Sequence, residues 1–249
     1  MKKINPIIVI PSRMGATRLP NKPLRLINDI PMIIQVVKRA TEANIAEILV
    51  ACGDKEIIDT LNSYGIAGIL TDPNLPSGSD RINEALNKND PDGKYNIVIN
   101  LQGDLPTIEK ECIQDCLDIL VKTDFDISTV GVKIDEHSED IKNPNVVKAI
   151  VDFSNGDIGR AITFKRDVTN IEAKNCYHHI GIYGYRREIL TKFTSLQPSA
   201  NELTHKLEQL RALDNGMTIG FKACNTVPIG VDTLEDLHKA SEYLKAIGK

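Results

Sequence analysis

The chain has 249 residues, and 30 Lys and Arg against 34 Asp and Glu give a formal net charge of −4. This balance argues against a nucleic-acid binder that works by bulk positive charge, and a composition with 41% hydrophobic and 26% charged residues is that of a globular protein. No run approaches the roughly 20 apolar residues of a membrane helix, and the apolar stretch at 7–10 is too short for a signal peptide. We therefore expect a cytoplasmic protein with neither a nucleic-acid nor a membrane partner.

The first half of the sequence alternates short apolar runs with longer amphipathic ones. The short runs are rich in Ile and Val and are bounded by Gly, Pro, Asn or Asp, which predicts strands at 7–10, 47–51, 67–71, 96–101 and 127–132. The amphipathic runs predict helices at 31–43, 55–64, 81–89 and 110–120. Because strands and helices alternate, we expect parallel pairing in an open α/β sheet with helices on both faces.

This alternation stops after residue 132. Strands are predicted at 146–151, 160–164, 179–185 and 219–223, the first two around an Asn-Gly turn at 154–157. Helices are predicted at 187–195, 202–215 and 233–247, and the last of these opens with a Thr-x-x-Asp pattern typical of an N-terminal cap. The second half therefore looks like an elaboration of the sheet.

A basic loop follows the first strand. Arg13, Arg18 and Lys22 stand within ten residues of a segment otherwise built from loop-forming residues, and together they could surround several phosphate oxygens. The loop has neither a Walker nor a GxGxxG pattern, and from composition alone it could equally be a solvated surface loop. Its position favours binding, because open α/β sheets bind ligands at the carboxyl ends of their strands.

Two carboxylates are candidates for a metal site. Asp104 follows the strand at 96–101, and if that strand is parallel to the first, Asp104 lies at the same sheet edge as the basic loop. A carboxylate beside phosphate-binding cations is typical of a Mg²⁺–nucleotide site. Asp232, just before the last helix, is the second candidate. Each could instead be a turn or cap residue.

Other polar segments carry weaker signals. The Ser-Gly-Ser-Asp-Arg loop at 77–81 could offer backbone groups to a base or ribose. In the strand at 179–185, His179 and Tyr183 share one side while Ile180 and Ile182 share the other. A single strand histidine more often packs in a core or faces solvent than it acts chemically.

The five cysteines are scattered and have no CxxC spacing, so we expect reduced thiols in the core. Cys112 and Cys116 would share one helix face, which leaves a metal or redox role open as a minor alternative.

Five separated motifs, in order and spanning nearly the whole chain, resemble the 3-deoxy-manno-octulosonate (Kdo) cytidylyltransferase family, also called CMP-Kdo synthetases. They are Pro-Ser-Arg-Met-Gly-Ala-Thr-Arg-Leu-Pro-Asn-Lys-Pro-Leu at 11–24, Ser-Gly-Ser-Asp-Arg at 77–81, Asn-Leu-Gln-Gly-Asp at 100–104, His-Ile-Gly-Ile-Tyr-Gly-Tyr-Arg at 179–186 with Leu-Glu-Gln-Leu-Arg at 207–211, and Gly-Val-Asp-Thr-Leu-Glu-Asp-Leu at 230–237.

The resemblance implies an activity and an architecture. The activity is transfer of a cytidylyl group from CTP to Kdo for lipopolysaccharide biosynthesis, by a homodimer. The fold implied is an open, mostly parallel, mononucleotide-binding α/β sheet flanked by helices, with a smaller mixed α/β portion for sugar binding and dimerisation. On this sequence we expect a CTP-binding portion at 1–133, a sugar-binding and dimerisation portion at 134–222, and a return segment at 223–249 that completes one catalytic unit.

The resemblance also implies roles for the residues that match the motifs. Arg13, Lys22 and Asp104 would be catalytic, and Asp104 and Asp232 would bind Mg²⁺. The CTP site would comprise Arg13, Arg18, Lys22, Ser77, Gly78 and Arg81. The sugar-acid pocket would be lined by Gln102, His179, Tyr183, Tyr185, Glu208 and Gln209.

The chain departs from the family pattern at a few positions. Leu105 stands where an acidic residue usually follows the motif Asp, Leu75 and Pro76 occupy the neighbourhood of a usual His, and Ser79 replaces a Thr. The family's Phe-Ser-Arg followed by Ile-Pro appears as Phe-Lys-Arg at 164–166 without Ile-Pro. These changes affect the sugar pocket more than the nucleotide site.

Three alternatives therefore remain open from the sequence. The first is a cytidylyltransferase for another acidic sugar, such as amino-Kdo or a sialic acid. The second is a metal-dependent glycosyltransferase, for which Asp124-Phe125-Asp126 has the required spacing although it precedes a predicted strand. The third is a non-catalytic nucleotide sensor, which would be expected to lack one of the two motif carboxylates.

Overall fold

The computed structural model describes the chain except for residues 1–3, 16–17, 155, 170–171 and 173. Two compact units are found, one formed by residues 1–114 and 228–249 and the other by residues 115–227. The sequence-based boundary at residue 133 falls inside unit 2, because the strand that ends there pairs with later strands of the same unit. The return segment begins at 228, five residues after the expected position.

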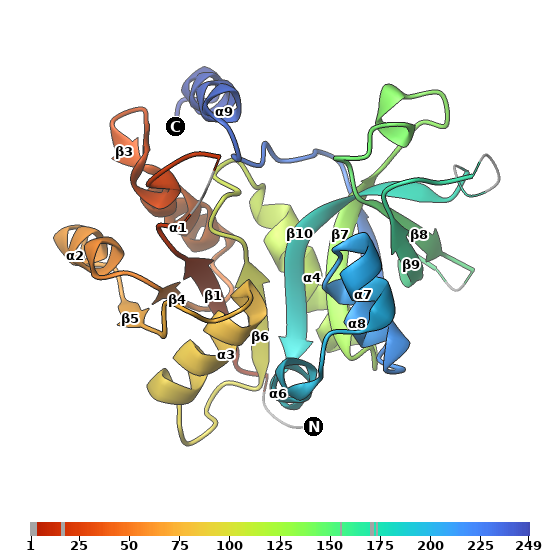
Figure 1. Ribbon diagram of the computed structural model, residues 1–249, viewed down its shortest axis with the longest axis horizontal. Coiled ribbons are helices and arrows are strands. Elements are labelled where there is room, and N and C mark those ends of the chain that lie inside the picture. Colours follow the sequence, from red (N-terminus) through yellow and green to blue (C-terminus); the bar gives the residue numbers. More distant parts are fainter. Residues whose placement is uncertain (1–3, 16–17, 155, 170–171, 173) are drawn as a thin grey trace. The chain divides into compact units, whose positions relative to one another are not determined.

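Unit 1 contains a four-stranded parallel sheet in the order β5–β4–β1–β6 (Figure 1). Its strands are β1 (Pro6–Ser12), β4 (Glu47–Cys52), β5 (Gly68–Leu70) and β6 (Ile97–Leu101). The Ile and Val side chains of β1 at 7–10 are buried on both faces, as in the interior strand of a parallel sheet. The predicted parallel α/β sheet is thus confirmed.

The helices of unit 1 lie close to their predicted positions. They are α1 (Met32–Ala43), α2 (Lys55–Ser63), α3 (Gly78–Asn89), the start of α4 (Lys110–Lys122) and α9 (Leu234–Ala246), with a short 3₁₀ turn η1 (Lys22–Leu24) and a two-stranded ribbon, β2 (Leu26–Ile27) and β3 (Ile30–Pro31). Helix α3 begins three residues earlier than predicted because the Ser77 side chain caps it by accepting the Asp80 N–H. The predicted cap of α9 is confirmed as a capping box between Thr233 and Asp236.

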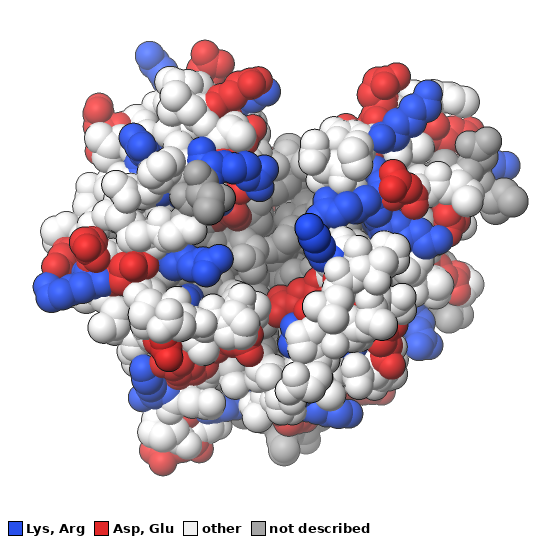
Figure 2. All heavy atoms as spheres, viewed as in Figure 1, with Lys and Arg blue, Asp and Glu red and all other residues white. Residues whose placement is uncertain are grey.

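Charged side chains of unit 1 are paired locally. Figure 2 shows acidic and basic groups side by side over α2 and over α9, where Lys55 pairs with Asp59 and Lys239 with Glu235. Such exposed pairs at (i, i+4) add little stability individually. They keep these helix surfaces polar.

The strands of unit 2 pair in a closed ring, β7–β11–β9–β8–β10–β7. They are β7 (Ile127–Lys133), β8 (Lys148–Asp152), β9 (Ile158–Lys165), β10 (Cys176–Arg186) and β11 (Ile219–Cys224), with the 3₁₀ turn η2 (Glu139–Ile141) and helices α6 (Arg187–Ser195), α7 (Ala200–His205) and α8 (Gln209–Asp214). Of these pairings, β7–β11 is parallel and the others are antiparallel, so the predicted mixed α/β character is confirmed. The predicted turn between β8 and β9 includes residue 155, which lies outside the described residues.

The helix predicted at 202–215 is wrong as a single element. Lys206 adopts the left-handed conformation (φ 54°) and ends α7, and α8 begins only at Gln209. A capping box at Ser199 and Glu202 fixes the start of α7, and at its end the N–H groups of Lys206 and Leu207 both bond back to the Glu202 carbonyl, which closes the helix. Glu208 and Gln209 consequently lie at the start of a new helix.

Candidate active site

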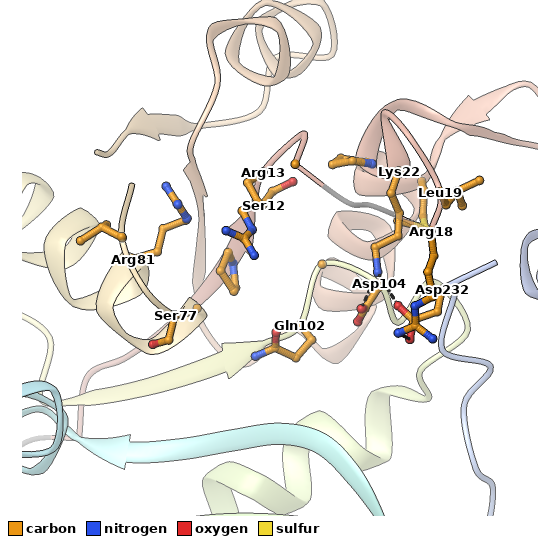
Figure 3. Close-up of a pocket in the computed structure, with 17 residues that line it drawn as sticks. Ser12, Arg13, Arg18, Leu19, Lys22, Ser77, Arg81, Gln102, Asp104 and Asp232 are labelled. Carbon is orange, nitrogen blue, oxygen red and sulfur yellow. Dashed lines mark hydrogen bonds and ion pairs between the residues drawn. The ribbon is translucent and has the colours of Figure 1, made fainter. Parts of the chain in front are cut away.

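A polar pocket of about 420 Å³ lies in unit 1 at the carboxyl ends of β1 and β6. Nine of the sequence-predicted site residues line it, namely Arg13, Arg18, Lys22, Ser77, Gly78, Arg81, Gln102, Asp104 and Asp232. In Figure 3, Ser77 and Arg81 stand at one end of the pocket, Lys22, Asp104 and Asp232 at the other, and Arg13 and Gln102 between them. The expected meeting of the basic loop and Asp104 at one sheet edge is confirmed.

Lys22 joins the two motif carboxylates. Its Nζ lies 2.9 Å from Oδ2 of Asp104, 3.0 Å from Oδ1 of Asp232 and 2.9 Å from the Val231 carbonyl oxygen. Burial by itself would lower the pKa of Lys22, but the two carboxylates outweigh burial and raise it. Lys22 is therefore a full cation at neutral pH.

The return segment reaches the first sheet through main-chain contacts. The Val231 N–H donates to the Asp104 carbonyl at 2.9 Å, and the Ile229 N–H donates to the Thr107 hydroxyl at 2.7 Å. Val231 is also buried in a cluster with residues of α9 and with Leu19 of the basic loop. These contacts place Asp232 beside Asp104 although it belongs to the end of the chain.

The other end of the pocket is organised by Arg81. Its guanidinium is buried and donates to the Thr71 hydroxyl at 2.5 Å and to the carbonyls of Asp72 and Pro73. The side chain thereby holds the loop that follows β5. The structure thus gives Arg81 a loop-holding role that the motif by itself did not reveal.

Ser77 and Gln102 are held in place by near neighbours. The Ser77 hydroxyl donates to the Asp80 carboxylate at 2.7 Å while it caps α3. Gln102 donates to Asn100 at 3.1 Å, and a Cβ on Gly78 would lie 3.7 Å from its amide oxygen. These contacts fix the positions of Ser77 and Gln102 in the wall of the pocket.

Asp54 does not line the pocket but holds the basic loop beside it, a role that the sequence motifs did not indicate. Its carboxylate accepts the backbone N–H of Met14 at 2.7 Å and so fixes the basic loop. Residues 16 and 17 of that loop lie outside the described part of the chain. Asp54 follows β4, so the signal that singled out Asp104, a carboxylate after a parallel strand, could have found it.

The remaining predicted site residues belong to unit 2. The rings of His179 and Tyr183 are 5.3 Å apart and those of Tyr183 and Tyr185 are 6.1 Å apart, which makes one aromatic row along β10. Burial lowers the pKa of His179 to about 3 and raises that of Tyr183. Both rings are therefore neutral at physiological pH, and His179 Nε2 lies 3.0 Å from the Thr129 hydroxyl.

Helix α8 carries the other two candidates. Gln209 is buried, and Glu208 forms the N-cap position of the helix with its carboxylate 3.7 Å from Arg211. Arg211 in turn makes a bidentate ion pair with Glu202. An ion pair between Arg211 and Glu202 therefore links α8 to α7.

Three further sequence-based expectations can be compared with the structure. The Asp124-Phe125-Asp126 alternative is disfavoured, since Asp126 accepts both the N–H and the hydroxyl of Thr218 and ties together two strand ends. Leu105, the departure from the acidic pattern, is buried. Of the five free cysteines, four are buried as expected, whereas Cys224 is partly exposed.

Within the described residues, no cluster of three or more His, Cys, Asp or Glu side chains is arranged to hold a metal ion. None of the helices in the described part combines the length and apolar character that a membrane span would need.

The matching family model and similar curated proteins are all described as cytidylyltransferases. Residues 7–219 match the family model described as cytidylyltransferase. A protein of Parvibaculum lavamentivorans named 3-deoxy-manno-octulosonate cytidylyltransferase is 48% identical over 96% of this chain and 93% of its own length. One of the same name from Paramagnetospirillum magneticum is 46% identical over 99% and 100% of the two chains.

Solved structures agree with these relatives. A CMP:2-keto-3-deoxy-manno-octonic acid synthetase complexed with CTP superposes with a TM-score of 0.88 at 32% identity, covering 98% of this chain and 99% of the other. A UDP-glucose pyrophosphorylase reaches a TM-score of 0.72 at 13% identity over 98% and 100% of the chains, which shows a shared fold alone.

Proposed function

The chain belongs to the 3-deoxy-manno-octulosonate cytidylyltransferase family, and from that premise we infer that it transfers the cytidylyl group of CTP to Kdo, giving CMP-Kdo and pyrophosphate. The observation that carries this inference is the convergence of the three basic side chains of the loop after β1 with two carboxylates in one pocket at the ends of parallel strands. We place the reaction in the cytoplasm, as a step toward lipopolysaccharide, and propose a homodimer; the family resemblance is the support for these three points.

We propose that CTP lies along the pocket seen in Figure 3. Arg13, Arg18 and Lys22 would bind the triphosphate, since guanidinium and ammonium groups are the preferred partners of phosphate oxygens. The cytidine would lie toward Ser77, Gly78 and Arg81. Arg81 also supports this end of the pocket through three hydrogen bonds to the loop at 71–73.

The oxygen atoms around Lys22 suit a hard divalent cation. Two carboxylates and a main-chain carbonyl already surround a positive charge there, and such oxygen ligands are the ones Mg²⁺ prefers. We propose that Asp104 and Asp232 hold Mg²⁺, with phosphate oxygens and water completing its shell. When bound, the ion would neutralise phosphate charge and lower the pKa of the attacking sugar hydroxyl.

The chain's own contribution to the reaction is positioning and charge stabilisation. The anomeric 2-hydroxyl of Kdo would attack the α-phosphorus in line with the departing pyrophosphate, so no protein nucleophile is required. Arg13 and Lys22 would stabilise the charge that accumulates on the leaving group. Asp54 would keep the loop that carries Arg13 in place through its bond to Met14.

We propose that the sugar acid is bound by Gln102 together with the aromatic row and the start of α8, namely His179, Tyr183, Tyr185, Glu208 and Gln209. The lowered pKa of His179 supports a role as a neutral hydrogen-bonding group rather than as a counter-charge for the sugar carboxylate.

A substrate matrix tests the proposal. Pyrophosphate release is measured with each of the four nucleoside triphosphates against Kdo, its amino analogue and sialic acid, in the presence of Mg²⁺. We expect release with CTP and Kdo well above every other pair. Release only with one of the other two sugars would reassign the acceptor, and no release with any pair would favour a nucleotide sensor.

A further inference from the structure

The Lys22 ammonium occupies oxygen atoms that a metal ion would also need. Its three hydrogen bonds to Asp104, Asp232 and the Val231 carbonyl use all the donors of an ammonium group. The second oxygen of Asp232 accepts from Arg18 at 2.9 Å. Two cations of the chain therefore neutralise both carboxylates.

A divalent cation and the ammonium compete for these carboxylates. Each carboxylate has more than one lone pair to offer, but two positive charges at contact distance repel each other strongly in a partly buried site. Binding of a metal ion to both carboxylates therefore favours the departure of Lys22 from them. Its long unbranched stem permits such a movement, and the pocket that it lines also holds Arg13 and Arg18.

Resting on the proposed function, we propose that Lys22 is an exchangeable counter-ion that couples nucleotide binding to metal binding. The triphosphate attracts the ammonium away from Asp104 and Asp232 and onto phosphate oxygens, which frees the carboxylates for the metal. The two ligands then bind with positive coupling, and this coupling is reciprocal by thermodynamic necessity. A metal ion without nucleotide binds weakly because it must displace Lys22 with no alternative anion for the lysine.

Lys22 opposes metal binding to the two carboxylates more strongly than Arg18 does. The Lys22 and Asp104 side chains are 16% and 35% exposed, whereas Arg18 and Asp232 are 68% and 49% exposed. Exposed ion pairs contribute little because water screens them and the side chains must give up rotamer freedom. Removing Lys22 should therefore change metal affinity far more than removing Arg18.

The test is a calorimetric titration of nucleotide-free protein with Mn²⁺. Lys22→Met keeps an unbranched side chain but offers neither a charge nor an oxygen ligand, and we expect it to bind Mn²⁺ at least about tenfold more tightly than the wild type. Lys22→Arg, which keeps the charge, should stay near the wild-type affinity. Arg18→Met should gain no more than about threefold.

Lys55→Met is the matched control. Lys55 makes two hydrogen bonds to the Asp59 carboxylate in the same unit but outside the pocket, so its removal should leave Mn²⁺ binding unchanged. Far-ultraviolet circular dichroism and thermal unfolding verify that each variant is folded. A second titration, with CTP in EDTA, should show weaker nucleotide binding to Lys22→Met than to the wild type.

Two results would overturn the proposal that a metal ion replaces Lys22 on the carboxylates. One is a Lys22→Met protein that binds Mn²⁺ no more tightly than the wild type. The other is a gain in Mn²⁺ affinity with CTP binding unaffected, which would mean that the lysine does not move to the nucleotide. Failure of the proposed function is distinguishable, because it appears as an absence of pyrophosphate release by the wild type, whatever the Mn²⁺ titrations give.

Discussion

The carboxylate of Asp54 accepts the backbone N–H of Met14 at 2.7 Å and so ties the loop after β1 to the loop after β4. Asp54 is also the N-cap residue of α2, but its side chain does not cap that helix. The carboxylate therefore serves the basic loop. Because Met14 follows Arg13 directly, this bond restrains the position of a proposed phosphate ligand.

Replacing Asp54 should weaken CTP use without unfolding the protein. A hydrogen bond to a charged group contributes on the order of 1.5 to 3 kcal/mol, so Asp54→Ala should lower kcat/KM for CTP roughly tenfold to a hundredfold. Initial rates of pyrophosphate release over a CTP series measure the effect. Asp59→Ala on the exposed side of α2 is the control, and equal behaviour of the two variants would contradict a role for Asp54 in the loop.

Removing Asp104 should abolish turnover. Asp104→Ala takes away one of the two proposed metal ligands, and we expect a loss of at least about a hundredfold in pyrophosphate release at saturating CTP, Kdo and Mg²⁺. The fold should survive, because Lys22 keeps Asp232 and the Val231 carbonyl as partners. Asp72→Ala, an exposed carboxylate after β5, should retain activity. Near-normal turnover by Asp104→Ala would contradict the proposal that Asp104 is a metal ligand.

The stability of the protein should fall between pH 6.5 and pH 5. Burial lowers the pKa of His179 to about 3 and also lowers that of His178, so both bind fewer protons in the folded than in the unfolded state within this window. The folded state is therefore fully favoured above the unfolded pKa near 6.5 and loses stability as the pH falls below it.

The magnitude is at most about 1.4 kcal/mol per pH unit for each histidine, and less than this because both residues are partly exposed to solvent. Urea unfolding at pH 7, 6 and 5 measures it. Glu172, with a pKa lowered to about 2 by Lys165, contributes stability that is lost only below about pH 4.5 and does not affect this window. His179→Gln should show a shallower pH dependence than the wild type, and an unchanged slope would argue that His179 is not neutral in the fold.

The Glu202–Arg211 pair should stabilise unit 2. Arg211 donates to the two oxygens of Glu202 at 2.7 and 2.6 Å, and the side chains are only 12% and 7% exposed for Glu202 and Arg211 respectively. Glu202→Gln removes the bidentate partner of a buried guanidinium, which keeps Glu208 at 3.7 Å as an anionic neighbour, so we expect a loss of about 3 kcal/mol in unfolding free energy. Denaturant unfolding checks this, with the exposed Glu188→Gln as control. A loss no larger than that of the control would show the pair to be unimportant.

Much of unit 1 could be predicted from the sequence alone. Strand and helix periodicities indicated the parallel sheet, and the rule that ligands bind at the carboxyl ends of parallel strands placed Arg13 and Asp104 at one sheet edge. Asp232 was the second carboxylate candidate, and the motif resemblance paired it with Asp104. These predictions succeeded because they depend on local patterns and on one general property of parallel sheets.

Other features depended on which groups meet across the fold. Local periodicity favoured one helix at 202–215, whereas Lys206 in the left-handed conformation divides it. The motif around Arg81 predicted a ligand-binding residue, and only the folded chain shows that this residue also makes three hydrogen bonds to the loop at 71–73.

The composition, with its net charge of −4, determined that any basic site had to be local, and the spacing of Arg13, Arg18 and Lys22 located it. Only the tertiary structure decided that Lys22 is bound to Asp104 and Asp232, 82 and 210 residues away. The physical reason is that a hydrogen bond forms only between groups that the folded chain brings within contact distance. No pattern within a short window of sequence records that the segment before α9 returns to the first sheet.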